Sequence, residues 1–442
     1  WLVRPTWKQV GVLALLFCLY KPFIRYMLSA MAEVICFVIL IFFYSLAVNY
    51  LRREKDYKLV ILFLVSGLMA LMRPYLVLFM LLPIFLWVRR GKSRAAKWRN
   101  GAAGTAVLAA VLGIYVYINH FLGAAYFTPL FYTDWITAFF EEGLFGGVWF
   151  TLRKAYYAGR TMVRVIREGF SDGLASGAHF AGYLVCMAVL AVQCFRDLIL
   201  FRRLKAETEE GTAAEVPEGK GAAAEVPVVG KTAQNAAVQA RRVWEKLVIE
   251  AHLAFCFLAM FFAILLMYKL TEGSRHLLTF MAAAMFVIAL MDTKFYKKAV
   301  LVGMTFAYFY FYVPLSPFDY EIPFRQEERA ASLEAWTEAM TERLVLNRED
   351  VPNYDNVVIW VFSDMVGGQE VRTSYQLLYG LPKGFGISCC MRDFVVPNID
   401  TLKSRYMAVP AYGEIALLCE ERGYGLVYGD DELALYELRG GE

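Results

Sequence analysis

The feature that most constrains this sequence is a series of long stretches almost free of charge. Four of them are Val34–Tyr50, Gly101–Asn119, Phe180–Phe195 and Val248–Tyr268. An α-helix needs roughly 20 apolar residues to cross a hydrocarbon core about 30 Å thick. Backbone polar groups in lipid are satisfied only within helices or closed barrels, and these stretches lack the alternation of barrel strands. The sequence therefore predicts a multi-span α-helical membrane protein.

Composition agrees, because only 19% of the residues are charged and 59% are hydrophobic. A soluble domain carries more charge on its surface. We expect about nine transmembrane helices, near residues 9–22, 34–51, 59–72, 75–88, 102–121, 180–201, 248–270, 277–291 and 299–315. Together they would form a membrane domain over residues 1–315.

Charge predicts the orientation. Lysine and arginine gather in alternate gaps, at residues 52–58, 89–99, 196–246 and 294–298, which the positive-inside rule places in the cytoplasm. Residues 122–178 and the chain after about Leu315 would then face outward. From Ser316 onward there are 11 basic and 22 acidic residues, a net charge of −11, whereas the rest of the chain carries +15. We expect residues 316–442 to form an extracytoplasmic domain.

This tail alternates helix and strand patterns, which favours a small α/β domain with at least two parallel strands. The expected elements are a helix near Gln326–Leu346, a strand at Asn356–Phe362, a helix at Gln369–Tyr379, a strand at Arg405–Val409, a helix at Glu414–Arg422 and a hairpin of Gly425–Tyr428 with Leu433–Leu438. Asp364 follows the first strand. It could bind a ligand at the carboxyl edge, but a helix or turn cap is the preferred interpretation.

Two segments of the membrane domain differ from the helices. The outer loop 122–178 contains a predicted amphipathic helix, Val148–Ile166, which we expect to lie on the membrane with Arg153, Lys154 and Arg160 among aromatic side chains. Residues 205–240 are rich in Ala, Glu, Gly and Lys and contain AAEVP twice. Such composition predicts a disordered cytoplasmic linker.

Three outward turns carry the most informative charges. The chain from Lys58 to Arg89 must cross twice around Arg73-Pro74. Each arm has about 15 residues, roughly 22 Å of helix, so the turn should be drawn below the outer lipid surface. Another short arm, Leu277–Met291, follows the turn that holds Arg275 and His276. The third turn contributes Lys21, Arg25 and Glu33.

Ionisable groups at that depth are costly, and they usually serve a function. The alternative is that each arginine extends to a lipid phosphate. We favour one shared anionic site for a lipid phosphate, because arginine binds phosphate through paired hydrogen bonds. If that phosphate carries a sugar, it becomes a leaving group whose developing charge the cations stabilise. A carboxylate such as Glu33 would deprotonate or orient an acceptor hydroxyl.

The same turns resemble the membrane GT-C glycosyltransferases, among them protein mannosyltransferase-like (glycosyltransferase family 39-like) and aminoarabinose transferase-like enzymes. The similarity covers roughly residues 9–315. It rests on three segments: the run Lys21–Glu33 before an apolar helix that ends at Arg52-Arg53; Gly67–Pro74, with Met72 where the family more often has Thr; and Ser274-Arg275-His276-Leu-Leu, with His276 where the family has Tyr.

The resemblance implies inverting transfer of a sugar from a polyprenyl-phosphate donor to a glycan, lipid or protein acceptor, outside a bacterial cell membrane. Glu33 would be an accessory acid. The donor phosphate would be bound by Lys21, Arg25, Arg73, Arg275 and His276. The family's principal acid lies in an earlier outer loop, which we expect upstream of Trp1, so no residue here takes its place. No cofactor is certain, and a divalent metal stays open.

Two other functions remain. A polysaccharide polymerase or ligase would use diphosphate-linked oligosaccharides, and Arg153, Lys154 and Arg160 would matter most. A non-catalytic, membrane-anchored protein would bind glycan through its tail. No nucleic-acid partner is expected. The cysteines lack CxxC spacing, so no metal-ligating set is indicated. We interpret His120, His179 and His252 as isolated interfacial or packing residues.

Overall fold

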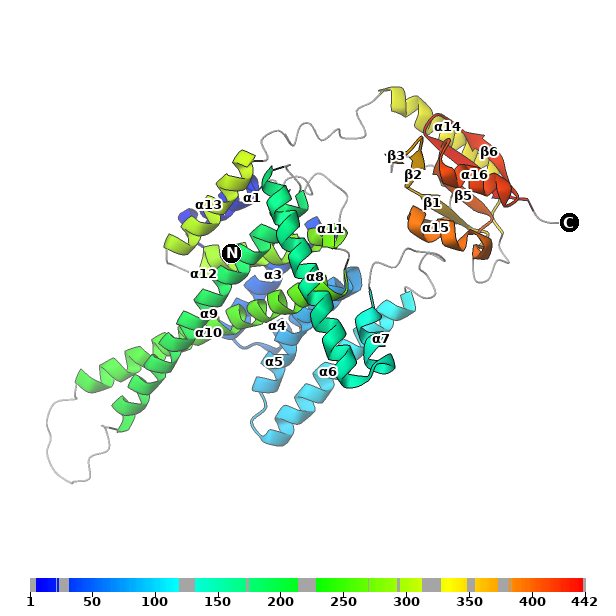
Figure 1. Ribbon diagram of the computed structural model, residues 1–442. Helices are drawn as coiled ribbons and strands as arrows, with labels where there is room; N and C mark the ends of the chain where they lie inside the picture. Colours follow the sequence, from blue (N-terminus) through cyan, green and yellow to red (C-terminus); the bar gives the residue numbers. More distant parts are fainter. Residues whose placement is uncertain are drawn as a thin grey trace, which may run out of the picture. The chain divides into compact units, whose positions relative to one another are not determined.

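The computed structural model describes residues 5–20, 22–23, 32–118, 132–171, 175–213, 228–268, 270–291, 295–311, 327–347, 354–372, 381–382 and 384–439. The chain divides into two compact units. The first comprises Trp1–Tyr115 and Phe131–Tyr320, and the second comprises Val116–Leu130 and Glu321–Glu442. Each is described by itself (Figure 1).

The described part of the first unit is helical. Its elements are α1 (Trp7–Leu19), α3 (Ala32–Arg52), α4 (Asp56–Met72), the 3₁₀ helix η1 (Pro74–Met80), α5 (Leu81–Arg89), α6 (Arg94–Tyr117), α7 (Asp134–Glu141), α8 (Gly143–Ser171), α9 (Ala175–Ala213), α10 (Val228–Leu266), α11 (Leu270–Gly273), the 3₁₀ turn η3 (Ser274–His276), α12 (Leu277–Met291) and α13 (Phe295–Phe311).

Helix α12 lies at the centre of this unit. Its residues from Leu277 to Ala289 are buried, and α1, α3, α9, α10 and α13 pack around it. A helix that is apolar on every side must be surrounded by other helices or by lipid. Because α12 follows η3 directly, the Ser274–His276 turn is attached to the buried helix at the centre of the unit.

Four described helices are long and apolar enough to cross a membrane: Ile35–Arg52, Arg94–Tyr117, Ser176–Glu209 and Gln234–Leu266. Several other apolar helices are shorter, such as Pro74–Arg89 and Ser274–Leu290. Only 6% of the most apolar part of Arg94–Tyr117 is buried within the protein. Since a large uncovered apolar surface is unfavourable in water, these helices indicate a bilayer around the unit.

Helices α9 and α10 run side by side along much of their length (Figure 1). Near their middle, Lys246 Nζ lies 2.6 Å from Asp197 Oδ2 and 3.3 Å from Glu250 Oε1, and Gln193 donates to Glu250. The prediction of a disordered linker over 205–240 is therefore wrong at both ends, because α9 continues to Ala213 and α10 begins at Val228. Residues 214–227 lie outside the described part.

The second unit contains a five-stranded sheet of order β4-β1-β5-β7-β6. Its strands are β1 (Val357–Val361), β4 (Gly386–Cys390), β5 (Tyr406–Pro410), β6 (Tyr424–Gly429) and β7 (Leu433–Leu438). Strand β1 pairs in parallel with β4 and with β5, whereas β7 pairs antiparallel with β5 and β6. The predicted α/β domain with two or more parallel strands is thus confirmed as a small sheet domain.

Helices cover both faces of this sheet. Trp336, Met340 and Leu344 of α14 (Glu327–Arg343) and the segment after it pack on one face, against Trp360 and Leu435. The other face is covered by α15 (Arg392–Asn398) and α16 (Glu414–Glu421), which bury Ile359, Met407 and Val409. Alternate residues of each strand therefore enter two separate cores.

One predicted element of the tail is wrong. The helix expected over Gln369–Tyr379 begins instead as strand β3 (Gln369–Arg372), which pairs antiparallel with β2 (Ser363–Val366). Gly367 and Gly368, with φ of 57° and 82°, form the turn between them. Two consecutive residues at positive φ are what a two-residue hairpin requires, and glycine adopts them without strain.

Candidate functional site

The Arg73-Pro74 turn joins two apolar arms, as the sequence predicts. Arg73 is the extended residue that ends α4, and Pro74 begins η1. Proline lacks an amide hydrogen and disfavours helix at the preceding residue, so the chain breaks here. The 17 residues of α4 span roughly 26 Å, and η1 with α5 spans roughly 27 Å. Both arms are shorter than a hydrocarbon core about 30 Å thick.

The second turn, η3, carries a buried histidine. His276 is 6% exposed, and its Nδ1 lies 3.3 Å from the hydroxyl of Tyr75, the second residue of η1. The rings of Tyr75 and His276 are 5.1 Å apart between centroids. The turn after α4 and the turn before α12 are therefore in direct contact, although about 200 residues separate them in the chain.

Tyr268 joins the same cluster from the end of α10. Its ring centroid lies 5.5 Å from that of His276, and it interacts electrostatically with Arg73, two residues before Tyr75. We call Arg73, Tyr75, Tyr268 and His276 the turn cluster. A cation, two phenols and an imidazole drawn from three segments thus lie close together.

Arg275 precedes His276 and is half-buried. Its Nε is buried and has no hydrogen-bond partner among the described residues. Buried donors in native proteins are nearly always paired, with protein, water or ligand. The buried Nε of Arg275 can therefore serve an anionic ligand next to the turn cluster.

Sequence reasoning missed the role of His179. It is 2% exposed, and its Nδ1 lies 3.0 Å from Ser274 Oγ, in the residue before Arg275. We expected His179 to be isolated, but it holds η3 against α9. His252 packs against the rings of Tyr44 and Phe79, at 6.0 and 5.8 Å between centroids, as expected. It is not isolated either, because Tyr44 Oη lies 3.1 Å from its Nδ1 and the Leu78 carbonyl lies 3.2 Å from its Nε2. His120 lies outside the described residues.

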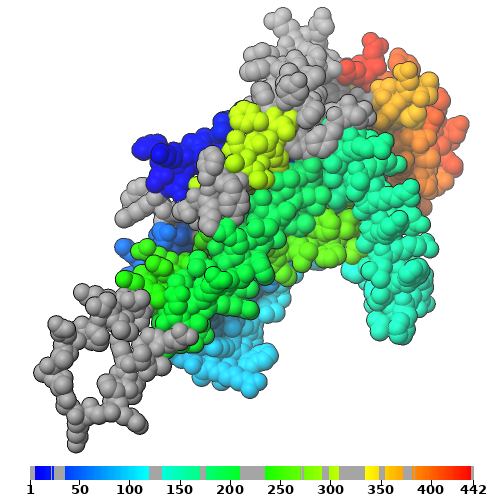
Figure 2. Space-filling view, turned by 60° about the vertical axis from the view of Figure 1, so that its left-hand side comes forward, coloured from blue at the N-terminus to red at the C-terminus, as the bar shows by residue number. Residues whose placement is uncertain are grey.

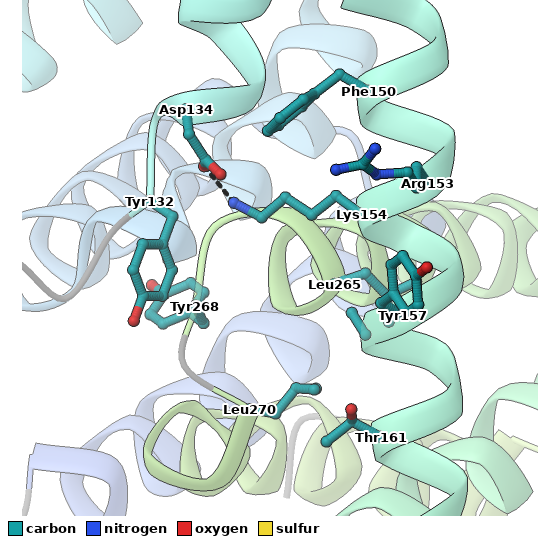
Figure 3. A pocket seen from close by; sticks show the side chains of 11 residues that line it. Tyr132, Asp134, Phe150, Arg153, Lys154, Tyr157, Thr161, Leu265, Tyr268 and Leu270 are labelled. Atoms are coloured by element: carbon teal, nitrogen blue, oxygen red, sulfur yellow. Dashed lines mark hydrogen bonds and ion pairs between the residues drawn. The ribbon is translucent and has the colours of Figure 1, made fainter.

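A pocket of about 510 Å³ opens beside Tyr268, between α8 and the end of α10 (Figure 3). The Tyr132 amide donates to the Met267 carbonyl over 2.7 Å, which fixes the start of α7 against this end of α10. The lining of the pocket is mainly aromatic and basic, and it comprises Tyr132, Asp134, Phe150, Arg153, Lys154, Tyr157, Ala158, Thr161, Leu265, Tyr268 and Leu270. Neither Arg73 nor Arg275 lines it.

Helix α8 supplies one wall of this pocket. It is longer than the predicted amphipathic helix Val148–Ile166, and it packs against α9 on the face of the unit shown in Figure 2. Arg153 and Lys154 line the pocket. Arg153 and Arg160 are both exposed on this helix, but Arg160 does not line the pocket. Lys154 forms an ion pair with Asp134, and its ammonium lies 5.0 Å from the centre of the Tyr132 ring.

The remaining expected residues cannot be placed in the site. Lys21 and Arg25 lie outside the described residues, and Glu33 is described only as part of the α3 backbone. Where the structure describes side chains, no group of three or more His, Cys, Asp or Glu is placed to hold a metal ion. The described side chains of the site are cations, phenols, one imidazole and one carboxylate, a set suited to binding anions and hydroxyl groups.

Asp364 in the second unit caps a helix, which was the preferred interpretation. Its Oδ2 accepts from the Ile415 amide in the first turn of α16 over 2.6 Å, and its Oδ1 accepts from Met365 over 2.8 Å. Arg392 Nε lies 3.5 Å from Oδ1. Burial raises the pKa of Asp364 above its ordinary value, while the two amides and Arg392 oppose that rise.

Comparisons with other proteins give no family. No protein-family model matches the chain, and neither the curated proteins nor the solved structures contain a match to it.

Proposed function

We propose that this chain is a membrane glycosyltransferase that moves a sugar from a polyprenyl-phosphate donor to an extracytoplasmic acceptor with inversion. The observation that supports this most is the position of Tyr268, which belongs to the turn cluster and also lines the pocket. A cationic site at the ends of short apolar arms therefore adjoins an open pocket. A transferase needs two such neighbouring places, one for the lipid phosphate and one for the acceptor.

The chemistry follows from the residues. The acceptor hydroxyl attacks the anomeric carbon from the face opposite the phosphate, so a new C–O bond forms as the bond to the phosphate oxygen breaks. The phosphate leaves with the electron pair, and Arg73 and Arg275 stabilise its added charge. The hydroxyl proton passes to a carboxylate. In this proposal Glu33 assists as an accessory acid.

The proposal includes a topology. The four long apolar helices and the shorter ones would together cross the membrane about nine times. The Arg73 and Arg275 turns, the pocket and the sheet domain would then face the extracytoplasmic side. Apolar surface on α6 and α9 would contact lipid, and the basic gaps would remain in the cytoplasm.

A second candidate is a polysaccharide polymerase or ligase. The observation in its favour is that Arg153 and Lys154 line the pocket, since this function would rely on basic residues of the outer loop. Its donor would be a diphosphate-linked oligosaccharide, which carries more negative charge than a single-sugar phosphate lipid. Donor class therefore separates the two functions.

The test uses the full-length protein in membranes. Arg73→Gln should weaken binding of a polyprenyl-phosphate sugar by about tenfold or more, because a charge-assisted hydrogen bond to phosphate is lost. Arg99→Gln, on the exposed start of α6, is the control and should leave binding unchanged. Binding is measured by competition against a photoreactive polyprenyl phosphate. If Arg73→Gln binds the donor as tightly as the wild type does, the assignment of the donor site to Arg73 is wrong. Tighter binding of diphosphate oligosaccharide lipids than of single-sugar phosphate lipids would favour the second candidate.

A further inference from the structure

We propose that the pocket beside Tyr268 is a saccharide site that selects an acidic sugar, one that bears a single carboxylate or comparable anionic group. The assignment of this sugar as the acceptor rests on the proposed function, but the binding site itself does not. Its volume of about 510 Å³ lies within the range of small-molecule sites, about 300–1,000 Å³.

The aromatic lining suits a sugar ring. Tyr132, Tyr157 and Tyr268 approach the pocket from three different elements, and Phe150 lies on the same wall as Tyr157 (Figure 3). The C–H face of a pyranose packs on aromatic rings, while the phenol hydroxyls can donate to and accept from its hydroxyl groups. A free phosphate would leave the rings uncovered.

The charges of the pocket favour one anionic group. Lys154 is already paired with Asp134, so these two lining charges largely cancel. Arg153 also lines the pocket, and among the described residues it has no ion pair or hydrogen bond. Its guanidinium can form a paired hydrogen bond with a carboxylate, which a neutral sugar lacks. One excess cation therefore matches one anion.

The Asp134–Lys154 pair would orient a bound sugar in the pocket. Lys154 lies over the Tyr132 ring, so its ammonium stays at one side of the pocket and Asp134 keeps a free acceptor oxygen for a sugar hydroxyl. An acidic sugar with its carboxylate on Arg153 would then place its hydroxyl groups toward Asp134 and Tyr268. Tyr268 is the residue that the pocket shares with the turn cluster.

The experiment measures binding to the full-length protein in nanodiscs of neutral phosphatidylcholine. The probes are glucuronic acid, glucose and inorganic phosphate, observed by saturation-transfer NMR and titration. Glucuronic acid should bind at least about tenfold more tightly than glucose, which is the effect of one charge-assisted pair. Arg153→Gln should remove that preference and leave glucose binding unchanged. Arg160→Gln, two turns along the same helix and outside the pocket, is the matched control and should keep it.

The role of the aromatic rings is tested with a variant and a matched control. Tyr157→Ala should weaken both sugars, whereas Tyr156→Ala, a neighbouring exposed tyrosine outside the lining, should not. Equal affinity of the wild type for glucuronic acid and glucose would overturn the inference. So would phosphate binding as tightly as glucuronic acid, or loss of sugar binding in anionic phosphatidylglycerol nanodiscs, because a lipid headgroup would then be the occupant. Arg153-dependent sugar binding without any sugar transfer would contradict the proposed function alone, whereas Arg73-dependent donor binding without a sugar preference would contradict only this inference.

Discussion

At the scale of single residues, Asp364 links two elements of the second unit through its carboxylate. Its oxygens accept from the amides of Ile415 and Met365, and Gly413 lies so close that any larger residue there would collide with it. Burial raises the pKa of Asp364, so the folded protein holds this proton more firmly than the unfolded chain. The contribution of this group to stability is therefore greatest below the ordinary aspartate pKa and falls as pH rises through the raised folded value.

Replacing Asp364 should loosen α16. Asp364→Ala leaves the Ile415 amide without its acceptor and Arg392 with Glu414 alone, which should cost about 2 kcal/mol of local stability at neutral pH. Hydrogen exchange of the full chain should show faster exchange of the Ile415 amide. Asp393→Ala is the control, because Asp393 is exposed, and it should change local stability by less than about 0.5 kcal/mol. Unchanged Ile415 protection in Asp364→Ala would show that the cap is not needed. Asp364→Asn should also remove this group's part of the pH dependence.

Some residues of the candidate site follow from sequence, and others do not. Arg73 and His276 stand at breaks in apolar runs, and the energetic cost of charge in lipid marks such positions. Tyr75, Tyr268 and His179 carry no such signal, because a tyrosine or histidine at an apolar helix end is equally compatible with packing. The roles of Tyr75 and His179 depend on contacts with residues 201 and 95 positions away in the chain.

At the scale of elements, hydrophobic periodicity predicts that a helix exists better than it predicts where the helix begins and ends. The apolar runs located the helices, but α9 and α10 extend beyond them into polar sequence that we expected to be disordered. The two helices support each other there, so pairing overrides composition. The β2–β3 hairpin was missed for a different reason. Its Gly367-Gly368 turn was visible in the sequence, but Gln369–Arg372 reads equally well as the start of a helix.

Close packing of α8 on α9 holds the pocket wall and can be tested by one glycine. A Cβ on Gly177 would lie 2.5 Å from the Val165 carbonyl oxygen and 2.7 Å from the Gly169 Cα. Gly177→Ala should therefore push the helices apart, lower the free energy of unfolding by about 1–3 kcal/mol, and weaken ligand binding at Arg153. On α8, Gly159→Ala meets nothing within 4 Å and should stabilise the helix slightly. Equal melting temperatures of the two variants in detergent would contradict this packing argument.

At the scale of the whole molecule, apolar exposure and charge agree on a membrane protein. Exposed apolar side chains such as Val38, Leu64 and Phe195 lie on three different helices of the first unit. The basic residues lie in the gaps between apolar helices, and the acidic excess lies in the second unit. The sequence predicted this division because hydropathy and charge act over whole segments. It could not predict how helices cluster around α12, which depends on the fit between their surfaces.

The proposed topology makes a last prediction about accessibility. Single cysteines should be introduced at exposed positions, after the exposed native Cys18 and Cys389 are changed to serine. In sealed cells, Leu144→Cys on α8 and Glu421→Cys on α16 should react with a membrane-impermeant maleimide, because both segments would face outward. Lys55→Cys and Lys92→Cys should react only after permeabilisation. Both of these sites lie in basic gaps that the positive-inside rule assigns to the cytoplasm, and all four side chains are exposed, so differences in reactivity report the compartment and not burial.

If Glu421→Cys is protected in sealed cells while Leu144→Cys reacts, the sheet domain is cytoplasmic and cannot take part in an extracytoplasmic reaction. If Leu144→Cys is protected and Lys55→Cys reacts, the whole orientation is reversed, and a donor presented at the outer surface could not reach Arg73.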